Sequence, residues 1–141
     1  MKLPKVPNTL SREWCESLGW TVDHCDRWIP GTMVTKDLFG MFDLVALSKQ
    51  GTGIIGIQAT GERNNARKRM RKIAENEAAG EWIKNSGTIA VHSWQWRGQT
   101  GAKKLQLVIF SAEPCMGDIS WYESDAIEFR VVKGKVQYAV S

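Results

Sequence analysis

Residues 42–74 read FDLVALSKQGTGIIGIQATGERNNARKRMRKIA, and this stretch decides the fold. Phe42–Leu47 is an apolar run of strand length, residues 49–53 have the composition of a tight turn, and Ile54–Thr60 is a second apolar run. We therefore predict that these two segments pair as a β-hairpin.

The segment after this hairpin has helical periodicity. Its apolar residues recur at the spacing of one helix face: Ala66, Met70, Ile73 and Ala74. The other face is basic and carries Arg67, Lys68, Arg71 and Lys72. We expect one helix that begins near Glu62 and extends past Glu75 toward Ala79, with residues 80–87 as its last turn and cap.

The remaining chain contributes a second helix and further strands. Before the hairpin we expect a helix from Asn8 or Thr9 to Leu18 with Gly19 as its stop, a strand over 20–28 and a loop over 29–41. After the basic helix we expect strands over 88–96 and 105–111, joined by a loop over 97–104, and a hairpin around 133–135. This order predicts an α/β fold with a mixed sheet flanked by helices. We assign one domain to residues 1–141, with a core over about 10–112 and a C-terminal extension over 113–141.

Length and charge limit the classes of function. A chain of 141 residues with 43% hydrophobic residues can bury one core without metal or disulfides, which excludes a multidomain machine. The net charge is +4, yet six basic residues fall within residues 63–72, and the rest of the chain is close to neutral. Such a concentrated basic segment indicates a phosphate-rich partner.

Cysteine and histidine patterns indicate no metal site of the zinc type. The three cysteines are widely spaced, so we interpret Cys15, Cys25 and Cys115 as reduced core thiols. His24 and His92 have no partner at metal-ligand spacing, and we interpret them as core or surface residues. We expect neither secretion nor a membrane span, because the chain has no long apolar run, and we expect a cytoplasmic location in a bacterial or phage-infected cell.

Three polar residues interrupt the apolar hairpin. Asp43 stands in the first strand, where a carboxylate costs several kcal/mol unless it is paired or binds a cation. Gln58 and Thr60 stand two positions apart in the second strand and so lie on the same face. Hairpin pairing is expected to bring both beside Asp43.

These residues resemble the PD-(D/E)XK nuclease superfamily, which has the restriction-endonuclease-like fold and includes archaeal Holliday junction resolvases. The shared pattern is a helix, an Asp opening one strand, a short turn, a strand ending in Glu-x-Lys, and a further helix. Asp43 matches the Asp, while Gln58-Ala59-Thr60 stands where Glu-x-Lys is expected. Residues 37–43, 57–60 and 92–98 are also similar to a group of small phage and bacterial proteins. The resemblance covers about residues 10–110.

The resemblance implies a bound Mg²⁺ (or Mn²⁺) that polarises a scissile phosphate and activates water. It assigns Asp43, Gln58 and the backbone carbonyl of Ala59 as metal ligands. Since Gln58 lacks the charge of a glutamate, another carboxylate is expected to contribute, with Asp37 as first candidate and Glu62 or Glu13 behind it. Thr60 cannot replace a lysine, so a cation from the following helix is expected to reach back; the candidates are Arg63, Arg67, Lys68 and Lys72.

The function implied is a metal-dependent DNA endonuclease on duplex or branched DNA, including junction-resolvase-like cleavage. The catalytic candidates are Asp43, Gln58, Thr60 and Asp37. The candidate nucleic-acid-binding residues are Arg63, Arg67, Lys68, Arg71, Lys72, Arg97, Lys103 and Lys104. Trp94 and Trp96 share a strand face next to Arg97, so they are candidates for stacking on an unpaired base as well as for core packing. A homodimer is expected, because one small domain covers too little duplex to reach both strands.

Other interpretations of the same residues stay open. Asp43 is explained equally as a structural carboxylate at the Gly40 bend or beside Lys36, Gln58 and Thr60 as a polar pair on an edge strand, and Asp37 as a turn residue. The basic helix face is explained as a solvated surface. The alternative functions are a catalytically inactive protein of the same fold that binds DNA or a nucleic-acid-handling protein, and a basic regulator that contacts the acidic surface of another protein.

Overall fold

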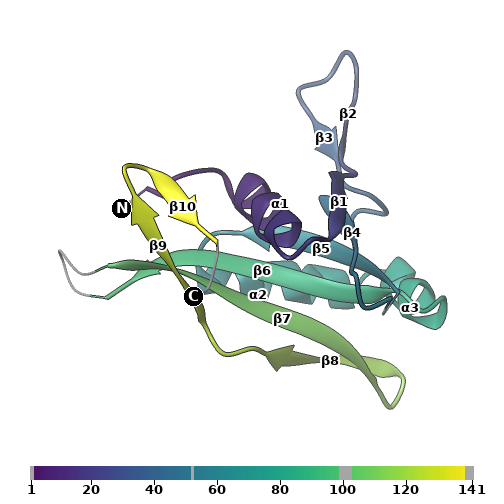
Figure 1. The fold of residues 1–141 in the computed structure, drawn as a ribbon. Coiled ribbons are helices and arrows are strands. Elements are labelled where there is room, and N and C mark those ends of the chain that lie inside the picture. Colours follow the sequence, from purple (N-terminus) through teal and green to yellow (C-terminus); the bar gives the residue numbers. More distant parts are fainter. Residues whose placement is uncertain (1, 52, 99–102, 139–141) are drawn as a thin grey trace.

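The computed structural model describes residues 2–51, 53–98 and 103–138. The elements are α1 (Pro7–Ser17), β1 (Thr21–His24), β2 (Arg27–Trp28), β3 (Thr35–Lys36), β4 (Leu44–Leu47), β5 (Ile54–Thr60), α2 (Arg63–Ala74), α3 (Glu77–Lys84), β6 (Thr88–Arg97), β7 (Lys104–Cys115), β8 (Asp118–Glu123), β9 (Ile127–Val132) and β10 (Lys135–Gln137). A curled mixed sheet separates α1 on one face from α2 and α3 on the other (Figure 1). The predicted α/β fold with a mixed sheet is confirmed.

The sheet combines an antiparallel meander with one parallel pair. Its strand order is β1-β4-β5-β6-β7-β9-β10, with β8 also paired to β7. β1, β4 and β5 are antiparallel neighbours, while β5 and β6 are parallel. A parallel pair needs a long crossover, and α2 and α3 supply it. The chain therefore passes directly from the polar end of β5 into the basic helix α2.

The predicted hairpin is present, and a glycine fixes how it begins. Leu44 pairs with Ile57 in the β4–β5 register. A Cβ on Gly56 would lie 2.5 Å from the ring of Phe42, so only glycine lets this ring pack across β5. The buried Phe42 ring thus anchors the chain immediately before Asp43.

Each face of the sheet has its own hydrophobic core. Leu10, Trp14 and Cys15 of α1 pack with Trp94 and other strand residues on one face. The other core lies beneath α2 and α3 and is built from Phe42, Ala66, Ile73, Ala79, Val108 and Phe110, among others. The Trp94 side chain is fully buried, which confirms core packing for it and excludes the alternative that it stacks on a base.

The prediction of one helix from Glu62 to a last turn and cap at 80–87 is wrong in one respect, since the helix breaks at Glu75–Asn76 into α2 and α3. The Asn76 side chain accepts a hydrogen bond from the N–H of Ala78 (2.9 Å) and so caps α3. Its amide nitrogen also donates to the carbonyl oxygen of Phe39 (2.9 Å). This break therefore ties the helices to the bend before β4.

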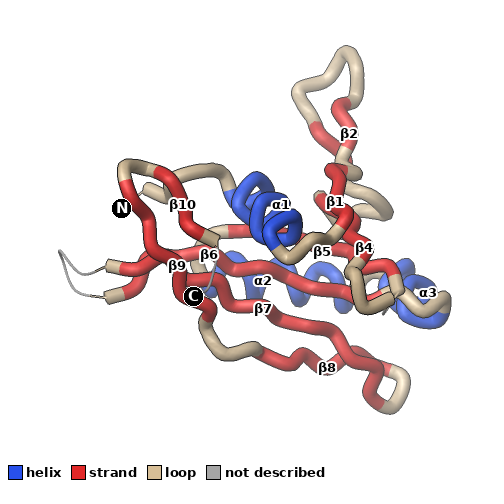
Figure 2. Tube along the Cα trace, in the orientation of Figure 1, coloured by secondary structure: helices blue, strands red, loops and turns tan. Residues whose placement is uncertain are grey.

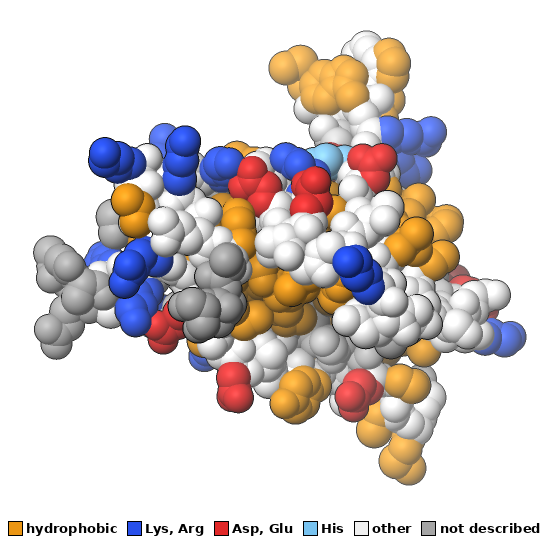
Figure 3. All heavy atoms as spheres, in the orientation of Figure 1, with side chains coloured by type: hydrophobic (Ala, Val, Ile, Leu, Met, Phe, Trp, Pro, Cys, Tyr) orange, Lys and Arg blue, Asp and Glu red, His pale blue; other side chains and the backbone are white. Residues whose placement is uncertain are grey.

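Residues 27–36 form a projecting arm where a strand to Trp28 and then a loop were predicted. β1 ends at His24, and Arg27–Trp28 pairs instead with Thr35–Lys36. The arm stands away from the sheet in Figures 1 and 2. Hydrophobic side chains gather on it in Figure 3, and the exposed ones include Trp28, Met33 and Val34. The chain leaves the body at Asp26 and returns at Asp37.

The C-terminal segment is part of the same sheet. β8, β9 and β10 extend it, the last two as the predicted hairpin around 133–135, and the Phe129 ring is buried in the α1-side core. The predicted loop over 97–104 includes residues 99–102, which lie outside the described residues. Cys15 is buried as expected, whereas Cys115 is exposed, so its interpretation as a core thiol is wrong.

Candidate active site

Asp43 lies where the chain enters β4, directly opposite Gln58 in β5. Its N–H donates to the carbonyl oxygen of Ile57 (3.0 Å), and its own carbonyl accepts from the N–H of Cys25 (2.9 Å). The β4–β5 register begins one residue later, at Leu44 and Ile57. The contacts of Asp43 with Gln58 and Arg69 place its side chain on the α2 face. Asp43 and Gln58 are both buried, with 8% and 3% of their surface exposed.

A second carboxylate meets Asp43 in this site. Burial raises the pKa of Asp43 to about 8, and a hydrogen bond shared with Asp37 and the charges of Asp37 and Asp26 act in the same direction. The Arg69 guanidinium acts in the opposite direction. Two carboxylates this close cannot both ionise without a cation, so near neutral pH the pair holds a proton.

The Gln58 amide connects Asp43 to a cation of α2. Its surroundings fix its orientation: the amide nitrogen donates to the Met41 carbonyl (2.8 Å) and to Asp43 Oδ2 (3.1 Å), and the amide oxygen accepts from Arg69 Nη1 (3.2 Å). The side chain therefore presents its donor, rather than its oxygen, to the carboxylate pair. It would have to rotate about its terminal bond to offer that oxygen to a metal ion.

A small hollow of about 10 Å³ opens at this point between the Asp37 bend and α2. Its walls include Asp37, Gly40, Met41, Gln58, Arg69 and Lys72. A space of this size is comparable to that of one water molecule, and hence suits a single small ion.

The cation nearest Asp43 is not among those proposed from the sequence, although Lys72 borders the same hollow. Arg69 was missed because the apolar spacing was used to sort α2 into an apolar and a basic face. Arg69 lies three residues after Ala66 and four before Ile73, which are both buried. That spacing places it beside the apolar face and was the available signal.

The other predicted residues of the site are more dispersed. Thr60 is buried and lies on the same sheet face as Gln58, paired with Ser93 of β6. Ala59 lies between them in β5. Glu13 belongs to α1 on the other face and forms an ion pair with Lys5 (2.7 Å), so its proposed contribution is wrong. Glu62 stands at the N-cap position of α2.

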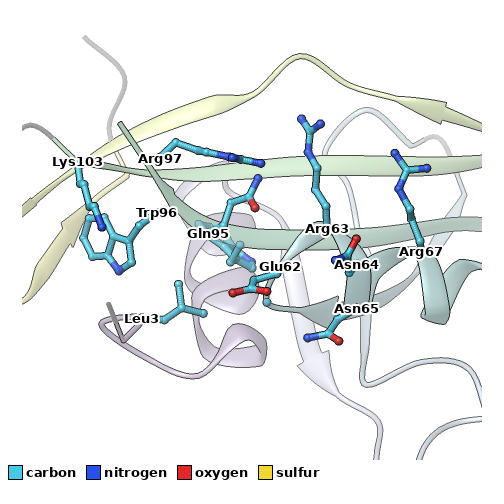
Figure 4. Close-up of a pocket in the computed structure, with 12 residues that line it drawn as sticks. Leu3, Glu62, Arg63, Asn64, Asn65, Arg67, Gln95, Trp96, Arg97 and Lys103 are labelled. Carbon is cyan, nitrogen blue, oxygen red and sulfur yellow. The ribbon is translucent and has the colours of Figure 1, made fainter. Parts of the chain in front are cut away.

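A larger cavity of about 800 Å³ lies beside the first turn of α2 and the far end of β6. Four of the predicted nucleic-acid-binding residues border it, namely Arg63, Arg67, Arg97 and Lys103 (Figure 4). Lys68 and Arg71 are exposed elsewhere on α2, and Lys104 forms an ion pair with Glu128 (3.2 Å).

Comparison with known proteins assigns no relative to this chain: no protein family, no curated protein and no solved structure matches it. Over the described ranges, no three His, Cys, Asp or Glu side chains form a metal-binding group. No helix in the same ranges is long and apolar enough to cross a membrane.

Proposed function

We propose that this protein is a nuclease that hydrolyses DNA with the help of Mg²⁺ or Mn²⁺. The observation that carries the proposal is the carboxylate pair of buried Asp43 and half-buried Asp37, with Gln58 beside Asp43. A carboxylate pair in a buried position is costly unless a cation completes it, and oxygen ligands of this kind suit Mg²⁺.

The order of elements supports the same proposal. The chain runs from α1 through β1, β2 and β3 to Asp43, which directly precedes β4. A short turn then leads to β5, with Gln58 and Thr60 near its end, and α2 follows. This is the order implied by the resemblance to the PD-(D/E)XK superfamily. A restriction-endonuclease-like fold is therefore part of the proposal.

The residues present fit a divalent cation. Asp43 and Asp37 would hold it, with the Gln58 amide oxygen and the Ala59 carbonyl completing the ligands. When bound, such an ion polarises a phosphate and lowers the pKa of a coordinated water. To bind it, Asp43 must release its proton and Gln58 must turn its amide, which frees Arg69. Arg69 and Lys72 then provide the positive charge that Thr60 cannot provide.

The basic face of α2 would bind the DNA backbone, since it begins directly after the polar end of β5. Arg67, Lys68, Arg71 and Lys72 are all exposed and hence accessible to phosphates. Both strands of a duplex are reached most simply by a homodimer, which we include in the proposal.

A second candidate is a protein of this fold that binds DNA without cutting it. It is favoured by the arrangement around Gln58, where Arg69 already supplies a cation near Asp43 and the amide nitrogen faces the carboxylate. The Arg69 guanidinium would then replace the metal ion as the partner of the carboxylate pair.

A cleavage assay separates these functions. Supercoiled, branched and single-stranded DNA are incubated with the protein in Mg²⁺, in Mn²⁺ and in EDTA. We expect metal-dependent cutting that Asp43→Asn and Asp37→Asn abolish and that Asp125→Asn, an exposed control between β8 and β9, leaves intact. Equal cutting by Asp43→Asn would refute the site, and DNA binding with no cutting in any metal would favour the second candidate.

A further inference from the structure

The cavity beside α2 is distinct from the carboxylate pair and has the size of a ligand site. Its volume of about 800 Å³ lies within the range of pockets that enclose small molecules. In Figure 4, Trp96 and Lys103 lie toward one end, Arg67 lies toward the other, and Gln95 and Arg63 stand between them. Arg63 precedes Arg69 by six residues, so the two sites are about 9 Å apart along the helix axis.

The walls of this cavity are positively charged. Arg63, Arg67, Arg97 and Lys103 face Glu62 as the single acidic residue of the described lining. Glu123 lies 3.6 Å from Arg63 and offsets a further charge. Counting Glu62 and Glu123 against these four cations leaves a net charge of +2, which matches the two negative charges of a phosphate monoester.

Two buried donors in the cavity lack an acceptor. Gln95 is 8% exposed, and its Nε2 has no hydrogen-bond partner among the described residues. The Nε atom of Arg63 is buried and unpartnered in the same sense. Buried polar groups in native proteins are nearly always paired, so two orphan donors in one cavity indicate that an acceptor is missing.

The first turn of α2 adds backbone donors. α2 has 12 residues, and its N-cap residue Glu62 makes no side-chain capping bond within the described chain. The initial N–H groups of a helix carry partial positive charge and bind anions where no side chain caps them. Because the orphan donors of Gln95 and Arg63 point to the same ligand, the site does not depend on the helix end alone.

We propose that this cavity binds a phosphate monoester carried by a nucleotide, with the phosphate held by Arg63, Gln95 and the first turn of α2. Trp96 is half-buried and borders the cavity, so its ring provides an apolar surface for the base. A monoester has three free oxygens where a backbone diester has two, and it therefore satisfies more of the donors. The inference rests on the proposed function only in taking nucleic acid as the source of the phosphate.

Binding measured in EDTA tests the site without cleavage. The probes are a short oligodeoxythymidine with a 5′-phosphate, the same strand with a 3′-phosphate, the strand with two hydroxyl ends, thymidine 5′-monophosphate and thymidine. We expect at least one phosphorylated strand to bind about tenfold tighter than the hydroxyl-ended strand. If thymidine 5′-monophosphate binds as tightly as the strands, the site holds and its ligand is a free nucleotide.

Variants assign the binding to the cavity. Arg63→Gln and Gln95→Leu should each remove the preference for a phosphorylated end, whereas Lys84→Gln on α3 should retain it. Gln95→Leu also removes an orphan donor, so it should melt no lower than the wild type without ligand, which shows that lost binding is not lost folding. Equal affinity for phosphorylated and hydroxyl-ended strands, or a preference that survives both cavity variants, would overturn the inference. Asp43→Asn should keep the preference, so failure of this inference and failure of the nuclease proposal are separable.

Discussion

Replacing Asp43 by asparagine should stabilise the fold, and the gain should grow as the pH rises. The pKa of Asp43 is about 8 in the folded protein, above its ordinary value of 3.8, mainly because of burial and then because of Asp37. A raised pKa means that the folded state favours the protonated form. Its contribution to stability is fully present below pH 3.8 and is lost as the pH rises through about 8. An amide has no such cost and keeps the shape of the side chain.

The size of the gain follows from these two values. They differ by about four pH units, and each unit corresponds to about 1.4 kcal/mol, which sets an upper limit of ~6 kcal/mol at pH 8. The effective dielectric constant inside proteins reduces such limits, so we expect ~2–4 kcal/mol. The introduced amide oxygen can accept from Gln58, and the amide nitrogen can donate to Asp37. For a domain of this size, the expected rise in Tm at pH 8 is on the order of 10 °C.

The measurement is urea unfolding of the wild type, Asp43→Asn and the control Asp125→Asn, each in EDTA at pH 5 and pH 8. Asp125 is exposed, so its replacement should change the free energy of unfolding little at either pH. The gain from Asp43→Asn should be larger at pH 8 than at pH 5 by ~1–3 kcal/mol. A gain of the same size at both values, or a loss at pH 8, would show that Asp43 is not held as a buried member of a carboxylate pair.

The remaining predictions concern the cation, the DNA and a buried histidine. Mg²⁺ or Mn²⁺ should raise Tm at pH 7, measured by scanning calorimetry, and should release a proton on binding, measured by titration calorimetry in buffers of different ionisation enthalpy. Asp37→Asn should abolish both effects. The logarithm of DNA affinity should fall linearly with the logarithm of salt concentration, and the slope should lose about 3–4 when four exposed cations are replaced by glutamine, namely Arg67, Lys68, Arg71 and Lys72; an unchanged slope would exclude α2 as the DNA-binding element. Burial lowers the pKa of His92 to about 3, so its contribution to stability is present above its ordinary pKa of 6.5 and is lost as the pH falls toward 3. Acid unfolding of His92→Gln should therefore show a weaker pH dependence than that of the wild type, and identical curves would contradict the neutral histidine.

The pairing of Asp43 with Gln58 could be predicted because it depends on local rules. Strand alternation sets the face of each residue, and a short turn sets the register between β4 and β5. Asp37 could be proposed because only a glycine-containing bend separates it from Asp43. Here the site residues are close in sequence, so local structure was sufficient.

The rest of the site depends on contacts between distant segments. Arg69 reaches Gln58 only because the crossover places α2 over β5, and spacing along the helix ranked other cations above it. Asp26 was missed because it is distant from Asp43 in the sequence. The two strands of the projecting arm pair Arg27 with Lys36, which brings the chain back beside Asp26 at Asp37. In the sequence, Gln95 alternates with Trp94 and Trp96 as any polar residue of a strand would. That its amide nitrogen lacks a hydrogen-bond partner is evident only once the cavity around it is known.

The break in the basic segment illustrates the same limit. Apolar spacing continues from Ile73 to Ala79, so periodicity alone predicts one helix. Asn76 ends that helix because its side chain caps the next one and bonds to Phe39, which is 37 residues earlier in the chain. The distant partner decides between two locally acceptable conformations.

The bend that carries Asp37 is held differently from the strands that carry Asp43 and Gln58. Phe39 in this bend has a positive φ of 55°, which is costly for a side chain of its size, and the bond from Asn76 and the Trp82 ring at 6.2 Å hold it there. Asp43, in contrast, is fixed by the sheet. A proton shared by Asp37 and Asp43 therefore links the bend to the sheet. When this proton is lost above pH 8, the two carboxylates repel each other. A bound cation would link the same two carboxylates at a pH where the proton has left. We therefore expect that a metal ion would hold the bend against the sheet under alkaline conditions, where the two carboxylates alone repel each other.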